Sequence, residues 1–218
     1  MPANHAMNAH QLVSEIWRKL AACHAGAASG MEAVLDELIA AYREPGRRYH
    51  TLEHIAALLR QLDQHRQATH DADALALAIL FHDAVYNPLR ADNERQSAEL
   101  ARARLTALAF APALVAKVAR YIEATEHGHT LETGDADLDL LLDLDLSTLA
   151  AVPKVYLSYA KAIRGEYAHV PDELYRRGRR QILEGFLARE RIYRTEQLHR
   201  LWEQRARVNI SAEIADLT

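Results

Sequence analysis

The chain has 218 residues and a formal net charge of −4, with 50% hydrophobic and 26% charged residues. This balance is typical of a soluble globular protein with a sizeable core, and the charge argues against nucleic acid or an anionic membrane as a partner. Ala and Leu dominate whereas Gly (8) and Pro (6) are scarce, which favours an all-α fold.

Cys23 is the single cysteine, which excludes an internal disulfide and a cysteine-rich zinc site. The first residues lack the basic and apolar regions of a secretory signal, and no apolar run reaches the length of about 18 residues typical of a membrane span. We therefore expect a cytoplasmic protein without a membrane partner.

Two amphipathic helices are predicted first. Apolar residues recur at helical spacing over residues 10–22, and again from Val34 to Ile39. The turn signal Glu44-Pro45-Gly46 ends the second helix.

The next segment, RRYHTLEHIAALLRQL, predicts a helix with Thr51 as its N-cap and Ile55 on its buried face. On this interpretation His50 lies just before the first helical turn and His54 just inside it. Their spacing of four residues lets both imidazoles point the same way.

An apolar run, ALAILF, predicts a buried helix from about Asp73 to Val85. His82 and Asp83 lie near its C-terminal end, where a helix inside a domain can open onto a cavity. A second pair, His70-Asp71, precedes the apolar run at a polar helix start, where Asp is favoured as a cap. We interpret that pair as structural.

Two further helices follow. Asp92 or Asn93 can cap the first of them, and Pro112 fits the first turn of the second. Glu94 in the first turn has an ordinary explanation, the favourable interaction of a carboxylate with the helix dipole.

Residues 131–152 form a dense acidic and apolar segment. Asp is poor in strands, so we predict a helix that brings one or two aspartates inward. Solvated positions explain Asp135 and Asp137, whereas leucines surround Asp143 and Asp145. A charge in an apolar stretch is costly unless it is paired or bound to a metal.

Beyond Pro153 the chain is predicted to be a helical tail, in which Pro171 opens a long helix through Arg189. We interpret the arginines of this helix as a solvated basic face, and phosphate contact is the alternative. They are Arg176, Arg177, Arg179 and Arg180. We expect a single domain over residues 1–218, with a metal-site core at about 47–150 and a C-terminal helical extension at 151–218.

Several residues of metal-ligating type stand out on three of the predicted helices. They are His54, His82, Asp83 and either Asp143 or Asp145. Two imidazoles and two carboxylates suit a divalent Mn, Fe, Co, Ni or Mg ion with water at open positions, and zinc is a less natural choice. His127 and His129 are candidates for a second metal by position alone.

The order His, His-Asp, Asp on a helical chain resembles the HD superfamily of metal-dependent phosphohydrolases, over about Arg47 to Ala150. YHTLEHI is similar to the YHNxxHA segment of cyclic nucleotide phosphodiesterases, which implies His54 as a metal ligand and His50 as a catalytic acid. FHDAVY supplies the paired ligands His82 and Asp83.

DLDLSTL looks like the DADxL segment that supplies the last ligand, and this likeness favours Asp145 over Asp143. NERQSAE and the YREPGRRYH lead-in resemble a bacterial branch of uncharacterised predicted HD phosphohydrolases. The resemblance implies an HD-domain-like helical bundle with extra C-terminal helices.

The implied function is metal-dependent hydrolysis of a phosphoester in a nucleotide or other small phosphorylated metabolite, by metal-activated water. Asp83 or Glu94 would orient that water or accept its proton. Candidate phosphate clamps are Arg47, Arg48 and Arg164. The alternative is a metal-containing, nucleotide-sensing HD module without efficient turnover. The substrate and the oligomeric state stay open, a homo-oligomer included.

Overall fold

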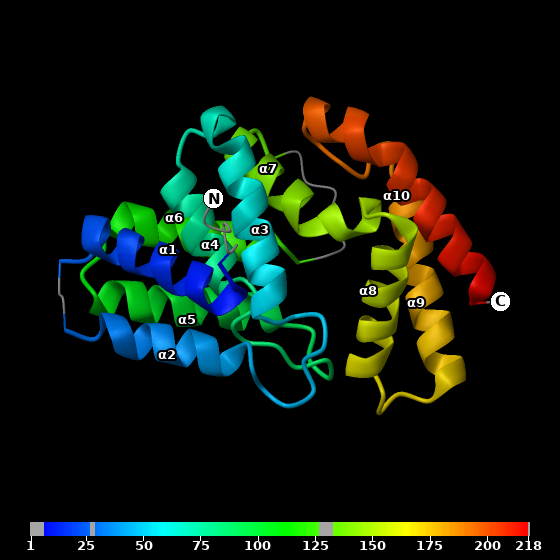
Figure 1. Ribbon diagram of the computed structural model, residues 1–218, viewed down its shortest axis with the longest axis horizontal. Helices are drawn as coiled ribbons and strands as arrows, with labels where there is room; N and C mark the ends of the chain where they lie inside the picture. The colour runs from blue at the N-terminus through cyan, green and yellow to red at the C-terminus, as the bar shows by residue number, and fades with distance from the viewer. Residues whose placement is uncertain (1–6, 27–28, 127–132, 218) are drawn as a thin grey trace, which may run out of the picture. The chain divides into compact units, whose positions relative to one another are not determined.

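The computed structural model describes residues 7–26, 29–126 and 133–217, and all regular structure in these ranges is helical (Figure 1). The all-α prediction is therefore confirmed for the described residues. The chain divides into two compact units, Met1–Glu126 and His127–Thr218. The expected metal-site core, at about 47–150, crosses the boundary between the units, and folding as a single domain stays a prediction.

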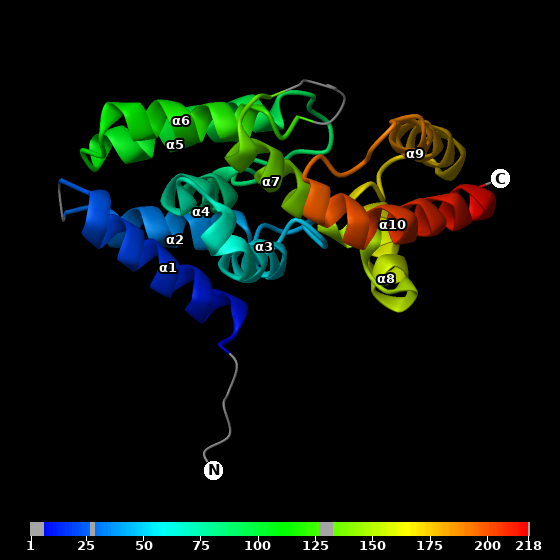
Figure 2. The ribbon, with the colours of Figure 1, turned by 90° about the horizontal axis from the view of Figure 1, so that it is seen from above.

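The first unit is built around one buried helix. Its helices are α1 (Ala9–His24), α2 (Met31–Ala41), α3 (Leu52–His65), the short 3₁₀ helix η1 (Arg66–Ala68), α4 (Ala72–Phe81), α5 (Asn93–Ala107) and α6 (Pro112–Glu123). Figure 2 shows α4 between α5 and α6 on one side and α1, α2 and α3 on the other. Every residue from Ala74 to Phe81 is buried, which explains why the helix has no polar face.

Capping residues set several helix starts as the sequence predicts. Asp71 caps α4, because its carboxylate accepts a hydrogen bond from the Ala74 N–H at 3.0 Å, and it also pairs with Lys117 at 2.9 Å. These contacts confirm a structural role for Asp71. Pro112 lies in the first turn of α6, and Thr51 occupies the N-cap position of α3 without a capping hydrogen bond from its side chain to the described residues.

The end of α4 differs from the prediction, which placed it at about Val85. The helix ends at Phe81, and His82 is its C-cap. Backbone groups after Phe81 bond outside the helix, since the Asp83 and Ala84 carbonyls accept from Arg47 and the Val85 N–H donates to Ser97 Oγ. Asp83 therefore lies in the turn that follows the helix.

The second unit places its helices around a short 3₁₀ segment. Its elements are α7 (Ala136–Asp145), η2 (Leu146–Ala150), α8 (Pro153–Glu166), α9 (Asp172–Leu187) and α10 (Glu196–Asp216). Helices α7, α8 and α10 all pack on η2, and α9 packs on α10.

Two polar residues of this unit are more buried than the sequence suggests. Asp137, expected to be solvated, is buried on α7. Arg179, expected on a solvated basic face, is buried on α9 and pairs with Glu213 at 2.8 Å, and Glu213 also accepts a hydrogen bond from the Tyr156 hydroxyl at 2.5 Å. The ion pair offsets the free-energy cost of burying the Arg179 guanidinium, which would be high if the guanidinium were unpaired.

None of the helices in the described ranges combines the length and the apolar character that crossing a bilayer requires.

Candidate metal centre

Three potential metal ligands converge in the first unit. His54 Nε2 lies 3.4 Å from His82 Nε2, and Asp83 Oδ2 lies 3.0 Å from His82 Nε2 and 3.7 Å from His54 Nε2. Both imidazoles are buried, and Asp83 is partly so. The structure thus brings together three of the four ligands predicted from the sequence, and we call them the His-His-Asp triad.

Two helix ends position the imidazoles of the triad. The first turn of α3 carries His54, and the C-cap of α4 carries His82. His82 Nδ1 lies 2.9 Å from the carbonyl oxygen of Ile79, which can only accept, so Nδ1 donates. This bond fixes the ring and leaves Nε2 of the neutral imidazole as the atom able to bind a metal.

The charge of Asp83 suits a ligand role. Burial raises the pKa of its carboxyl, but the neighbouring imidazoles of His82, His50 and His54 outweigh burial and hold the pKa below its ordinary value. The carboxylate is therefore ionised at neutral pH and faces two imidazoles.

The spacing of the triad fits one divalent ion. Ligands about 2.1 Å from an ion lie about 3.0 Å apart at adjacent octahedral positions. The three observed separations, 3.0, 3.4 and 3.7 Å, are close to that value. Small side-chain adjustments would bring all three atoms onto one ion.

His50, the predicted catalytic acid, lies at the edge of the triad. Its ring centroid is 6.1 Å from that of His54, and its ring stacks on Tyr86 at 4.2 Å. Tyr49 meets it edge-on at 5.0 Å. The two tyrosines enclose a half-buried imidazole, and the sequence reasoning did not single out either of them although both lie in the motifs quoted above.

Glu94 lies in the first turn of α5, which is tied to the loop following Asp83. Asn93 Oδ1 accepts a hydrogen bond from the Asn87 N–H at 2.9 Å, and Ser97 Oγ accepts one from the Val85 N–H at 3.0 Å. Glu94 is half-buried between these two anchors. Its favourable position at a helix N-terminus also explains it, so the catalytic role stays a prediction.

The predicted phosphate clamps have different surroundings. Arg48 is exposed, whereas the Arg47 side chain is only 3% exposed and donates to the backbone carbonyls of Asp83 and Ala84. Arg164, in the second unit, donates to the carbonyls of Tyr167 and Val170 beyond the end of α8. These contacts give Arg47 and Arg164 structural roles, and phosphate contact stays a prediction for all three arginines.

The remaining ligand candidates belong to the second unit. Asp143 is fully buried and accepts hydrogen bonds from the Arg194 N–H at 2.7 Å, the Thr195 N–H at 2.8 Å and the Thr195 hydroxyl at 2.6 Å. Burial raises its pKa to about 6 against the opposing effect of these bonds. Asp145 is the last residue of α7, and its role as a ligand stays a prediction. His127 and His129 lie outside the described residues.

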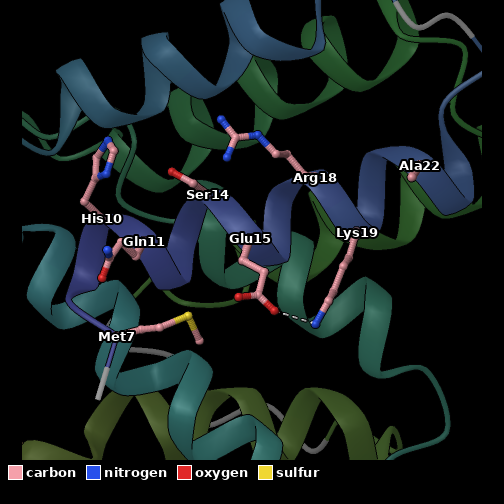
Figure 3. A pocket seen from close by; sticks show the side chains of 8 residues that line it. All are labelled: Met7, His10, Gln11, Ser14, Glu15, Arg18, Lys19 and Ala22. Carbon is pink, nitrogen blue, oxygen red and sulfur yellow. Dashed lines mark ion pairs between the residues drawn. The ribbon is translucent and has the colours of Figure 1, made fainter. Parts of the chain in front are cut away.

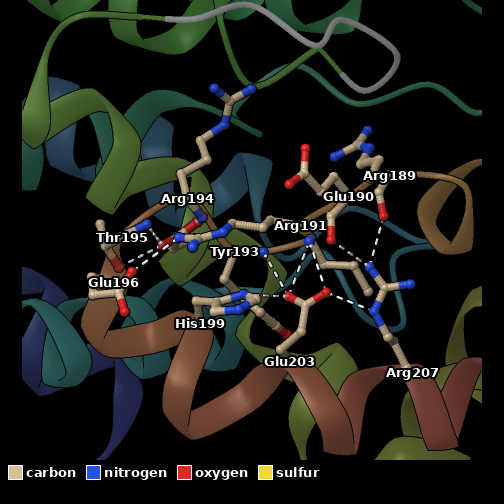
Figure 4. Close-up of polar contacts among 12 residues, drawn as sticks. Arg189, Glu190, Arg191, Tyr193, Arg194, Thr195, Glu196, His199, Glu203 and Arg207 are labelled. Atoms are coloured by element: carbon tan, nitrogen blue, oxygen red, sulfur yellow. Dashed lines mark hydrogen bonds and ion pairs between the residues drawn. The ribbon is translucent and has the colours of Figure 1, made fainter.

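A second carboxylate organises the same loop between α9 and α10 (Figure 4). Glu203 accepts hydrogen bonds from the N–H groups of Ile192 and Tyr193 and pairs with Arg207 at 2.7 Å. His199 also contacts it at 3.3 Å. Their spacing of four residues on one helix predicts such a contact from the sequence. We call Asp143 and Glu203, which accept hydrogen bonds from backbone N–H groups of this loop, the loop-holding carboxylates.

Two hollows on the surface of the first unit are lined by described residues other than the triad. One, of about 700 Å³, follows the exposed face of α1, where Glu15 and Lys19 pair with each other at 2.7 Å (Figure 3). The other, of about 510 Å³, is lined partly by Tyr42, Arg47 and Thr51. None of the triad residues is among the described residues that line either hollow.

Comparisons of the chain with protein-family models, with curated proteins and with solved structures found no match.

Proposed function

We propose that the chain is a metal-dependent phosphohydrolase that cleaves a phosphoester of a nucleotide or other small phosphorylated metabolite. The observation that carries the proposal is the convergence of His54, His82 and Asp83, whose ligand atoms all lie within 4.8 Å of one another. The motif order described in the sequence supports an HD-like bundle as its framework. A cytoplasmic location and a small phosphorylated substrate belong to the same proposal.

The triad would hold a divalent ion, with Asp145 as the predicted fourth ligand. An ion in this position supplies a water of lowered pKa and polarises a phosphoryl oxygen. The mixed nitrogen and oxygen donors favour Mn, Fe, Co or Ni, with Mg and Zn as further candidates.

The chain itself supplies the proton transfers. His50, at the edge of the triad, would protonate the leaving oxygen of the substrate. Asp83 or Glu94 would orient the attacking water or accept its proton. The stacking of His50 on Tyr86 limits the movement of the imidazole, which favours proton transfer to a fixed point.

The test begins with protein purified without chelator. We expect elemental analysis to find a bound divalent metal. We also expect the protein to release phosphate from members of a panel of nucleotides and sugar phosphates when Mn²⁺, Co²⁺ or Mg²⁺ is added. His50→Ala should lower kcat by about 100-fold or more and leave metal content unchanged, because general acid catalysis contributes roughly 10²–10⁴-fold. A matched control is His10→Ala, on the exposed face of α1.

A protein that binds metal but releases no phosphate from any substrate would contradict hydrolysis and favour the nucleotide-sensing module. Two histidines and one carboxylate are also the ligands of non-haem iron oxygenases. Oxygen consumption in the presence of Fe²⁺ is therefore measured with the same panel of nucleotides and sugar phosphates, to test for oxygenase activity. A protein that binds no divalent metal would overturn the metal centre itself.

A further inference from the structure

Arg47 is a buried arginine that joins the two loops carrying the metal-site residues. One loop precedes α3 and contains His50, and the other follows α4 and contains Asp83. The Arg47 side chain is only 3% exposed, which is unusual for an arginine unless its charge and donors are satisfied.

Nε of the Arg47 guanidinium pairs with the Glu44 carboxylate at 3.2 Å, and the two terminal nitrogens donate to backbone carbonyls of both loops. Nη1 donates to the carbonyl oxygen of Asp83 at 2.7 Å and, more weakly, to that of His50 at 3.3 Å. Nη2 donates to the carbonyl oxygen of Ala84 at 3.0 Å. The carbonyls of Asp83 and Ala84 lie beyond the end of α4, so these bonds replace the helical ones they lack.

Aromatic rings hold the guanidinium in this position. Its central carbon lies 5.3 Å from the ring centroid of Tyr42 and 5.4 Å from that of Tyr86. The Tyr42 hydroxyl donates to the Leu80 carbonyl of α4 at 3.0 Å, and Tyr86 stacks on His50. One side chain is thereby connected to the end of α4, to the Asp83 turn and to the proposed acid.

We propose that Arg47 is a positioning residue, which fixes Asp83 and His50 relative to each other, rather than a substrate-binding residue. This inference rests on the proposed function. A planar guanidinium can reach three carbonyls from both loops at once, whereas the single ammonium of lysine cannot reproduce that fork. A phosphate would have to compete for donors that already hold the Asp83 turn.

The test compares Arg47→Met and Arg47→Lys with Arg43→Met, which removes an exposed arginine from the same segment. Co²⁺ affinity is measured without any phosphate compound. We expect both Arg47 variants to bind Co²⁺ on the order of 10–100-fold more weakly, the usual effect of losing a group that orients a metal ligand. Arg43→Met should bind as the wild type does.

Amide hydrogen exchange gives a second readout that needs no metal. The Ala84 N–H is bonded to the Phe81 carbonyl, and the Val85 N–H is bonded to Ser97 Oγ. Both amides should exchange faster in the metal-free Arg47 variants than in Arg43→Met. If Arg47→Met does not fold, the lysine variant carries both measurements.

Unchanged Co²⁺ affinity together with unchanged exchange would overturn the positioning role. Weaker binding of inorganic phosphate at unchanged metal affinity would instead show a phosphate clamp and would also overturn it. A wild-type protein that binds neither Co²⁺ nor any other divalent metal would refute the proposed function. In that case exchange alone decides whether Arg47 holds the Asp83 turn.

Discussion

The His-His-Asp triad and the loop-holding carboxylates bury similar groups in opposite surroundings. The carboxylate of Asp83 faces two imidazoles. The carboxylates of Asp143 and Glu203 face backbone N–H groups that they fix in place. A buried aspartate is therefore weak evidence for a metal centre until its partners are known, since backbone donors explain the burial completely in one case.

The electrostatics of Asp83 and Asp143 also differ. Neighbouring imidazoles lower the pKa of Asp83, although burial opposes them. Asp143 has neutral donors only as its hydrogen-bond partners, and burial prevails, so its pKa rises to about 6. A carboxylate whose neighbours are imidazoles could take part in holding a metal ion, whereas the donors around Asp143 hold a loop.

The largest expected effect is a difference in Co²⁺ affinity between variants of Asp83 and Asp143. Asp83→Asn should weaken Co²⁺ binding by more than about 100-fold, since loss of a ligand exceeds the roughly 10–100-fold effect of losing its orienting partner. Asp143→Asn should leave Co²⁺ affinity within about threefold of wild type but lower the free energy of unfolding by about 1–3 kcal/mol, because its amide N–H₂ would face donors.

Calorimetric titration and urea unfolding of each variant measure these effects side by side. Equal losses of metal affinity in both variants would erase the distinction between the two regions. So would an Asp143→Asn protein as stable as the wild type.

An intermediate effect concerns pH and Glu203. Burial raises the pKa of this carboxyl, but hydrogen bonds from the Ile192 and Tyr193 N–H groups and from Arg207 prevail and lower it below the ordinary value of 4.5. Its stabilising contribution is therefore present above pH 4.5 and is lost as the pH falls through the lowered pKa. Glu203→Gln should reduce the free energy of unfolding by about 1–3 kcal/mol at pH 7.

The wild type and Glu203→Gln should converge in stability as the solution is acidified below pH 4.5, because a protonated carboxyl resembles the amide. Urea unfolding at several pH values follows the difference. A gap that stays constant from neutral to acid pH would show that the ionised carboxylate is not the stabilising species. Glu184→Gln, at an exposed position of α9, serves as the control.

The smallest effect tests a single hydrogen bond of the loop-holding carboxylates. Thr195→Val removes the hydroxyl that donates to Asp143 and should cost about 1 kcal/mol, while Thr195→Ser keeps the donor and should cost less. Metal affinity should not change in either variant. Urea midpoints that rank the serine variant below the valine variant would exclude the hydroxyl as the source of the effect.

Helix positions could be predicted from the sequence because they depend on local signals, and the triad could be predicted because its residues follow the motif order described in the sequence analysis. Pro112 and Asp71 lie where a first-turn proline and an N-cap are expected, and the rings of His50 and His54, four residues apart, lie 6.1 Å from each other. The apolar run before His82 correctly predicted a buried helix whose end reaches the site.

What the sequence could not supply depends on contacts between distant residues. Arg47 matched a phosphate clamp by type, but only the fold places three carbonyls around its guanidinium. Asp143 and Asp145 are alike in local pattern, and the structure shows that Asp143 holds the Arg194 and Thr195 N–H groups about fifty residues later in the chain. Arg179 is buried because Glu213, from another helix, pairs with it.

The complete burial of α4 has a consequence for how this protein tolerates change. A helix with a solvated side can accept new side chains there, but from Ala74 to Phe81 every position meets a packed neighbour. Among random single substitutions, those in this segment should be the most depleted under selection, even conservative ones such as Ala78→Val. Homologous sequences should therefore show the smallest variety of residues along α4, because of its packing and independently of the chemistry of the site.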